Sequence, residues 1–240
     1  MKKKLIIIFS IINVLLLSLF GVVHSYLSDY YHADTIATSS LESTDNITIT
    51  DEDDYIVFKP KEYTTGIIFY PGGKVEADSY APLCEEYAEN GIMVVLVKMP
   101  KNIPFLGQNR ADKITKDQSV EHWYMAGHSL GGLCASNYIS SHVDEYDGLI
   151  LLASYSLKDL SNTELKVLSL YGSKDGILNM DNYEKYRTNL PSTTIEEILY
   201  GGNHSQFGSY GLQEGDGVAT ISATLQVEET VQYTKILMEE

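Results

Sequence analysis

Short, uninterrupted apolar runs alternate with segments of helical period along most of this chain. Strands that are buried on both faces produce such runs, and helices normally cover both faces of a parallel sheet. The pattern therefore predicts an α/β fold with a doubly wound, mostly parallel sheet. The predicted strands are residues 66–70, 92–97, 122–126, 148–153, 167–171 and 194–199, and the predicted helices are residues 78–90, 108–118, 129–141, 180–189 and 218–238.

Ahead of this region, polar and apolar residues alternate at 46–50 and again at 54–58. A period of two is typical of strands with one buried face. The acidic residues 51–53 between the two stretches predict the tip of a hairpin.

The N-terminus has a different pattern, in which a lysine cluster at residues 2–4 precedes an apolar run of 19 residues from Leu5 to Val23. As a helix, at about 1.5 Å per residue, this run would reach about 28 Å, close to the thickness of a bilayer core. A cleaved signal peptide normally has an apolar region of about 7–15 residues, so the length favours an uncleaved transmembrane anchor. Cleavage near Ser25 is the alternative.

Both interpretations make the lipid bilayer a partner of this N-terminal segment. Lysines that flank such a segment stay on the cytoplasmic side. We therefore expect a single-pass protein of the cell membrane with the rest of the chain on the extracytoplasmic side, or a secreted protein if the segment is cleaved.

The charge balance narrows the range of other partners. The 240 residues include 17 basic and 33 acidic side chains, for a net charge of −16. Because nucleic-acid binding needs clustered Lys and Arg, this balance argues against a nucleic-acid partner. The two cysteines do not form a C-x-x-C pair, so the sequence predicts neither a disulfide framework nor a structural zinc site.

The most informative stretch is Gly127-His128-Ser129-Leu130-Gly131, which follows a predicted strand and opens a predicted helix. A serine on such a sharp turn projects its hydroxyl, and glycine two residues before and after it avoids collisions with neighbouring backbone. The turn also puts the Leu130 N–H at a helix N-terminus, where it can stabilise an oxyanion. We expect Ser129 to be a nucleophile; an inert serine in a glycine-rich turn is the alternative.

A nucleophilic serine needs a base, and the base needs an orienting carboxylate. Asp175 follows the predicted strand at 167–171, and His204 follows the one at 194–199. The chain order Ser129, Asp175, His204 is the order that such a sheet requires, and all three would lie at the carboxyl ends of strands. The alternatives are a turn residue at Asp175 and a capping or packing residue at His204.

The second oxyanion donor is expected in the loop after the strand at 66–70. Glycine lets the backbone approach a substrate closely, so Gly73 is the expected donor, with the Lys74 N–H as the next choice.

Two features nearby have simpler interpretations. The acidic, glycine-rich stretch with Glu214 and Asp216 is interpreted as a solvated turn rather than a cation site. The ring of His128 is expected to face away from Ser129.

Five stretches carry a family pattern: Y-Y-H-A-D at 30–34, Y-P-G-G-K-V at 70–75, G-H-S-L-G-G at 127–132, G-S-K-D-G at 172–176 and G-G-N-H-S-Q-F-G-S-Y-G at 201–211. Together they resemble the α/β-hydrolase superfamily, and within it the bacterial α/β hydrolase fold-5 domain family. The resemblance implies a hydrolase-type sheet with Ser129, Asp175 and His204 as the triad, and a substrate that is generally unassigned.

We therefore expect a membrane anchor or signal segment at residues 1–25, a connector at 26–44 and an α/β-hydrolase domain at 45–240 without a separate lid. The expected function is hydrolysis of small-molecule carboxylic esters through an acyl-enzyme intermediate, with no metal and no organic cofactor. Acyl transfer or amide hydrolysis by the same residues is one alternative, and a non-catalytic binding module on this fold is another.

Overall fold

The computed structural model describes residues 2–114, 117 and 119–239, and the chain divides into two compact units, up to Tyr30 and from Tyr31 onward. The first unit contains helix α1 (Lys2–Ser28). From Ile8 to Ser28 this helix has the length and hydropathy to cross a membrane, which is also true of many N-terminal signal sequences. The amide of Asn13 donates to the Phe9 carbonyl at 2.8 Å, so its polarity is partly satisfied within the helix.

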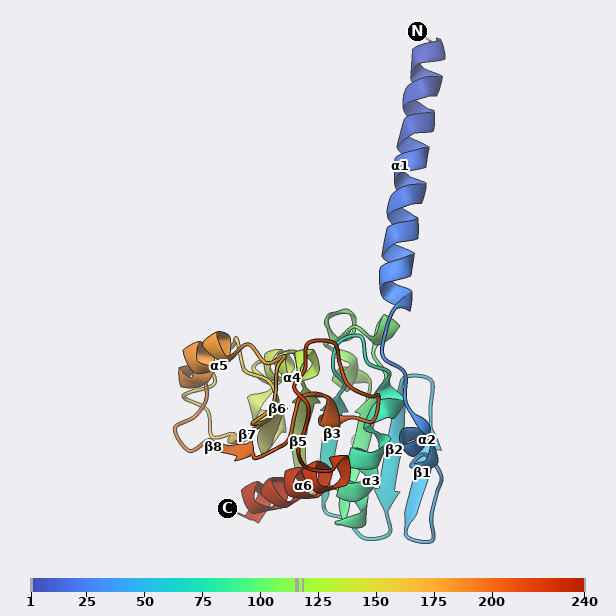
Figure 1. Ribbon diagram of the computed structural model, residues 1–240. Helices are drawn as coiled ribbons and strands as arrows, with labels where there is room; N and C mark the ends of the chain where they lie inside the picture. The colour runs from blue at the N-terminus through green and yellow to red at the C-terminus, as the bar shows by residue number, and fades with distance from the viewer. Residues whose placement is uncertain (1, 115–116, 118, 240) are drawn as a thin grey trace. The chain divides into compact units, whose positions relative to one another are not determined.

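The second unit is built on one eight-stranded sheet (Figure 1), in the order β1-β2-β4-β3-β5-β6-β7-β8. β1 (Ile47–Asp51) and β2 (Tyr55–Pro60) form the predicted antiparallel hairpin, and β2 also pairs antiparallel with β4 (Ile92–Val97). All pairs beyond β4 are parallel. The remaining strands are β3 (Thr65–Tyr70), β5 (His122–His128), β6 (Gly148–Leu152), β7 (Lys166–Gly172) and β8 (Ile195–Leu199). The predicted sheet is confirmed.

Helices cover both faces of this sheet. On one face lie α3 (Ala81–Glu89) and α6 (Ala223–Glu239), and on the other lies α4 (Leu130–Ile139). Two shorter helices are α2 (Thr35–Ser39) and α5 (Met180–Tyr186). The described elements include no separate lid domain.

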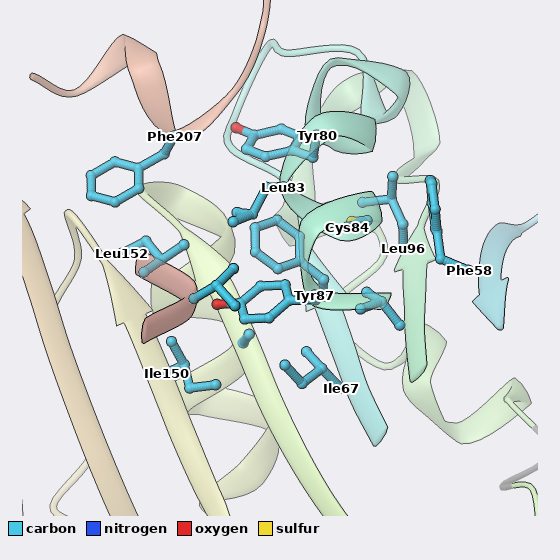
Figure 2. Packing of buried hydrophobic residues seen from close by; sticks show 14 of the residues in the cluster. Phe58, Ile67, Tyr80, Leu83, Cys84, Tyr87, Leu96, Ile150, Leu152 and Phe207 are labelled. Carbon is cyan, nitrogen blue, oxygen red and sulfur yellow. The ribbon is translucent and has the colours of Figure 1, made fainter. Parts of the chain in front are cut away.

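Two buried clusters hold these layers together. Figure 2 shows the first, where Leu83 and Tyr87 of α3 pack on Ile67, Ile150 and other side chains of the sheet. The second lies under α4, which contributes a group of small and aliphatic side chains, Cys134, Ala135 and Ile139. Successive residues of a strand point to opposite faces, so neighbours in β3 enter different clusters. This double burial explains the uninterrupted apolar runs.

The predicted helix at 108–118 is wrong in its described part, which holds only a 3-10 turn at Arg110–Lys113. The hydroxyl of Tyr70 donates to the Gln108 carbonyl at 2.7 Å and accepts from the Ala111 N–H at 3.1 Å. This side chain of β3 thus satisfies backbone groups that would otherwise pair within a helix. The conformation of the segment is therefore set by its contact with the sheet and not by its helical pattern of apolar residues. Residues 115, 116 and 118 of the predicted helix lie outside the described residues.

Candidate active site

Ser129 lies between β5 and α4 in a backbone conformation that non-glycine residues rarely adopt, with φ 53° and ψ −123°. A Cβ at Gly127 would lie 2.5 Å from the carbonyl carbon of Gly131, and a Cβ at Gly131 would collide with the carbonyl oxygens of Tyr70 and Pro71. The two glycines therefore let the turn close tightly while the serine side chain points outward.

The turn is anchored to the neighbouring strand. The Ser129 N–H donates to the Leu152 carbonyl at 2.9 Å, and the hydroxyl of Ser154 donates to the Ser129 carbonyl at 2.7 Å. Both contacts come from the end of β6 and the residues after it. Since both backbone polar groups of Ser129 are held, its hydroxyl has a fixed origin from which to project.

The half-buried Ser129 opens into a cavity of about 190 Å³. His204 lines the same cavity, so the structure brings these two predicted residues to one site. The rest of the lining is uncharged and mixes apolar side chains with a few polar ones: Leu130, Leu133, Ala153, Ser154, Tyr155, Ile177, Leu178 and Asn179.

Asp175 and His204 form a buried pair, with side chains only 2% and 1% exposed. The Oδ2 atom of Asp175 lies 2.9 Å from Nδ1 of His204. Its Oδ1 atom accepts from the N–H groups of Ile177 and Leu178 at 2.9 and 2.8 Å. A carboxylate held in this way accepts from the imidazole, which puts the ring proton on Nδ1 and leaves the Nε2 lone pair free to take a proton.

The Nε2 atom of His204 is buried and has no hydrogen-bond partner among the described residues. An unpaired buried polar atom is costly in an ordinary core. Nε2 makes no hydrogen bond to the Ser129 hydroxyl in the structure, although both residues line one cavity. His204 lines the cavity that Ser129 also lines, and an unprotonated imidazole nitrogen there has the chemistry of a general base.

The predicted oxyanion donors, Gly73 and Leu130, lie in two segments that pack against each other. A Cβ at Gly73 would lie 2.8 Å from Cδ2 of Leu130, so the loop after β3 lies against the start of α4. In the described part of the chain neither the Gly73 nor the Leu130 N–H has a hydrogen-bond acceptor. The Lys74 N–H, by contrast, donates to the Asn102 carbonyl at 2.7 Å, which removes the next choice for this role.

Backbone strain gathers around these groups. Five described non-glycine residues have positive φ: Lys74, Lys101, Asn102, Ser129 and Ala153. Lys74 and Asn102 are joined by the hydrogen bond just named, and Ala153 lines the cavity with Ser129. Residues held in such conformations persist only where the surrounding structure over-determines them, as it does at functional sites.

His128 has a structural role that the sequence did not reveal. Its ring packs on the rings of His204 and Phe207, with centroids 4.4 and 5.4 Å apart, and it does not line the cavity. The Tyr80 hydroxyl accepts from the Gly72 N–H at 2.9 Å and lies 2.7 Å from Nδ1 of His128. Burial, together with the neighbouring His204 imidazole, holds the pKa of His128 well below its usual value, so this ring stays neutral.

The loop that carries His204 is held on both sides by side chains that no local motif indicates. Before it, the buried side chain of Gln226 accepts from the Asn203 N–H at 3.0 Å and donates to the Asn203 carbonyl at 2.8 Å. After it, Asp216 accepts from the Ser205 N–H and hydroxyl at 2.8 and 2.6 Å. The expected solvated turn holds at Glu214, which is exposed, but at Asp216 the half-buried carboxylate is held by these hydrogen bonds.

The comparisons with known proteins agree with this architecture. A family model described as "Alpha/beta hydrolase family" matches residues 66–228. The chain belongs to the alpha/beta hydrolase family. The match begins in β3 and ends within α6, so it covers the loops that carry Gly73, Ser129, Asp175 and His204. No match is found among curated proteins.

Solved structures of similar fold come from several organisms. A predicted CIB-like hydrolase from Thermoplasma acidophilum is 18% identical with a TM-score of 0.58, and the alignment covers 79% of this chain and 97% of that one. Est1E from Butyrivibrio proteoclasticus, solved with ferulic acid bound, is 14% identical with a TM-score of 0.60 over 80% and 100%. TT1662 from Thermus thermophilus is 12% identical with a TM-score of 0.58 over 81% and 99%. At these identities the likeness shows the fold of this alpha/beta hydrolase.

Proposed function

We propose that this alpha/beta hydrolase is a serine hydrolase that cleaves carboxylic esters through Ser129, His204 and Asp175. The observation that carries the proposal is the buried Asp175–His204 hydrogen bond of 2.9 Å beside a strained serine that opens into the same cavity as the imidazole. This set supplies a nucleophile, a base with a free nitrogen and a carboxylate that orients the base.

The proposed chemistry assigns one role to each of the three side chains. The Ser129 hydroxyl attacks the acyl carbon while Nε2 of His204 takes its proton, and Asp175 stabilises the imidazolium that forms. The tetrahedral intermediate then expels the alkoxide, which receives that proton, and leaves an acyl-enzyme. Water repeats the sequence, with His204 again as base, and releases the acid and the free serine.

The N–H groups of Leu130 and Gly73 stabilise the oxyanion in this mechanism. Leu130 opens α4 and the loop with Gly73 packs against its side chain, which supports donors that need little reorganisation when charge develops. Removing one such donor costs about 2.7–4 kcal/mol of transition-state stabilisation in comparable sites.

The size and polarity of the cavity favour small, uncharged ester substrates. Its volume of about 190 Å³ and its uncharged lining suit a short acyl group better than a long or ionised one. Tyr155 and Asn179 add polar atoms to the lining, which can orient the alcohol portion.

We also propose that α1 anchors the hydrolase in the cell membrane, with the catalytic unit on the extracytoplasmic side. The apolar length of α1 and the lysines at its N-terminal end support this topology. The intact mass of the protein isolated from membranes tests it: an unprocessed N-terminus supports the anchor, and loss of about 25 residues means cleavage and secretion.

A fluorophosphonate probe tests the catalytic proposal directly, because it reacts with activated serines whatever the natural substrate. The full-length chain in detergent is expected to label, Ser129→Ala is expected not to, and Ser136→Ala is the matched control. Ser136 is a buried serine of α4 whose hydroxyl donates to the Leu133 carbonyl at 2.9 Å. An unlabelled wild type, or equal labelling of Ser129→Ala, would refute the nucleophile and favour a binding module.

Product analysis then separates the remaining reactions. With p-nitrophenyl butyrate as substrate, free butyrate is the expected product even when an alcohol or amine is added in excess. Transfer of the acyl group to the added acceptor would instead identify an acyltransferase, and faster cleavage of the matched anilide would identify an amidase.

A further inference from the structure

Asp216 lies between the loop that carries Asp175 and the loop that carries His204. Its Oδ1 atom accepts from the N–H of Gly176, the residue after Asp175, at 3.0 Å. Oδ1 also lies 3.4 Å from the His204 backbone nitrogen, and Oδ2 accepts from Ser205, the residue after His204. One carboxylate thus receives hydrogen bonds from both loops, next to the two residues of the buried pair.

The backbone around Asp216 fits closely onto the acid loop. A Cβ at Gly217 would collide with the Lys174 carbonyl oxygen, and a Cβ at Gly176 would lie 2.5 Å from the Gly215 carbonyl oxygen. The Gly217 N–H donates to Oδ1 of Asp216 at 2.8 Å, which fixes the side chain on its own backbone. The contact is therefore a packed junction, and the carboxylate has little freedom to move away from it.

The charge of Asp216 is maintained in this position. Burial alone would raise the pKa of this carboxyl group, but hydrogen bonds from Gly176, Ser205 and Gly217 together hold it below its usual value. An ionised carboxylate accepts at both oxygens, whereas an amide or a neutral acid presents a proton to at least one of these donors. Only the carboxylate satisfies all of them.

Another hydrogen bond joins the same loops just before the two residues of the pair in the sequence. The Lys174 N–H, one residue before Asp175, donates to the carbonyl of Gly202, two residues before His204, at 2.8 Å. Contacts between the two loops therefore come both before and after the Asp175–His204 pair in the sequence: the backbone hydrogen bond joins residues that precede the pair, and Asp216 joins the residues that follow it. Without the contacts of Asp216, the loops are free to separate where the carboxylate contacts the imidazole.

We propose that Asp216 is a positioning residue. It sets the separation of Asp175 and His204 and thereby holds the imidazole where it can accept the Ser129 proton. The proposal rests on the proposed function. In such sites a displacement of about 1 Å costs up to about a hundredfold in rate, because the proton transfer needs a near-linear contact.

The test compares Asp216→Asn with Asp147→Asn in the full-length chain in detergent. Asp147 is a matched control, since its carboxylate also joins two segments, accepting from the Trp123 N–H at 3.0 Å and facing Nδ1 of His122 at 3.0 Å. It lies at the amino ends of β5 and β6, the edge of the sheet opposite the site. Fluorophosphonate labelling rates, kcat and KM for p-nitrophenyl butyrate, and thermal unfolding are measured for both variants.

Asp216→Asn is expected to lower the labelling rate and kcat by about 10- to 100-fold with KM changed less than threefold, while Asp147→Asn stays within twofold. The low-field proton resonance of the His204 Nδ1–H should weaken or broaden in Asp216→Asn alone. If Asp216→Asn does not fold, Ser205→Ala removes one hydrogen bond to the carboxylate and is expected to lower kcat about three- to tenfold. Its effect is read by the same measurements.

Two results would overturn the proposal. One is a wild-type labelling rate and an unchanged Nδ1–H resonance in a folded Asp216→Asn, or in Ser205→Ala where that variant replaces it. The other is a loss of activity that tracks the loss of stability equally in Asp216→Asn and Asp147→Asn. If the wild type itself does not label, the proposed function fails, but the resonance still reports whether Asp216 holds the pair together.

Discussion

Replacement of Asp175 by asparagine tests the buried pair with the smallest change in shape. In the wild type, Oδ1 accepts from the N–H groups of Ile177 and Leu178, and Oδ2 lies 2.9 Å from Nδ1 of His204. An asparagine must give its oxygen to the two N–H groups, because its NH2 cannot accept a hydrogen bond. The NH2 then faces His204, and the imidazole must accept at Nδ1 and carry its proton on Nε2.

That tautomer blocks the proposed reaction, because Nε2 is the atom that takes the Ser129 proton. In serine triads this exchange of tautomer lowers kcat by about 10⁴-fold, or about 5.4 kcal/mol at 1.36 kcal/mol per decade. The two backbone hydrogen bonds to Oδ1 survive, so only the charge-assisted bond to His204 is lost. The free energy of unfolding should therefore fall by no more than about 1–3 kcal/mol.

The assay is the rate of p-nitrophenyl butyrate hydrolysis and of fluorophosphonate labelling, with thermal unfolding to show that the variant is folded. Asp159→Asn is the control: Asp159 also accepts a backbone N–H, from Ser161 at 3.0 Å, but it is exposed and does not line the cavity. A folded Asp175→Asn that retains more than a tenth of wild-type activity would refute the assignment of the orienting carboxylate.

Three further outcomes are expected. A Cβ at Gly131 would strike the carbonyl oxygens of Tyr70 and Pro71, so Gly131→Ala should push the serine turn from the oxyanion loop and cut labelling at least tenfold; an unchanged rate would show that the turn adapts freely. A cavity of about 190 Å³ holds about six groups of roughly 30 Å³ each, so p-nitrophenyl ester hydrolysis should be fastest for acyl chains of about four to six carbons, and equal rates up to dodecanoate would contradict the size argument. The depressed pKa of His128 means that the unfolded chain binds a proton that the folded chain does not, so stability should fall as pH drops below about 6.5, by up to about 1.4 kcal/mol per pH unit from this residue. Denaturant unfolding of His128→Asn at pH 7 and pH 5 should show a smaller loss than the wild type, and an equal loss would contradict the assignment.

The sheet was predictable because its physics is local. A strand buried on both faces must be apolar at consecutive positions, and β3 and β6 show this directly. The turn at Ser129 was predictable for a similar reason, since its steric needs fall on two glycines within two residues of it. Asp175 and His204 could be placed because each follows a strand of that sheet.

The features that sequence analysis missed depend on contacts between distant residues. The predicted helix at 108–118 does not form in its described part, because the hydroxyl of Tyr70, some 40 residues earlier in the chain, bonds to backbone groups of this segment. Asp216 looked like a solvated turn because its partner Gly176 is 40 positions away. Gln226 reaches Asn203 across 23 positions and leaves no local pattern at either end. A single sequence gives no distance between such pairs, so their roles emerge only from the fold.

The order in sequence of the contacts that hold the Asn203–Ser205 segment has a consequence for biosynthesis. Ser129, Asp175 and His204 have all been synthesised once the ribosome reaches position 204. Asp216 and Gln226, whose side chains hold this segment, are synthesised later. We therefore expect a chain truncated near position 210 to contain Ser129, Asp175 and His204 but to lack the contacts that hold this segment, and so to show no fluorophosphonate labelling.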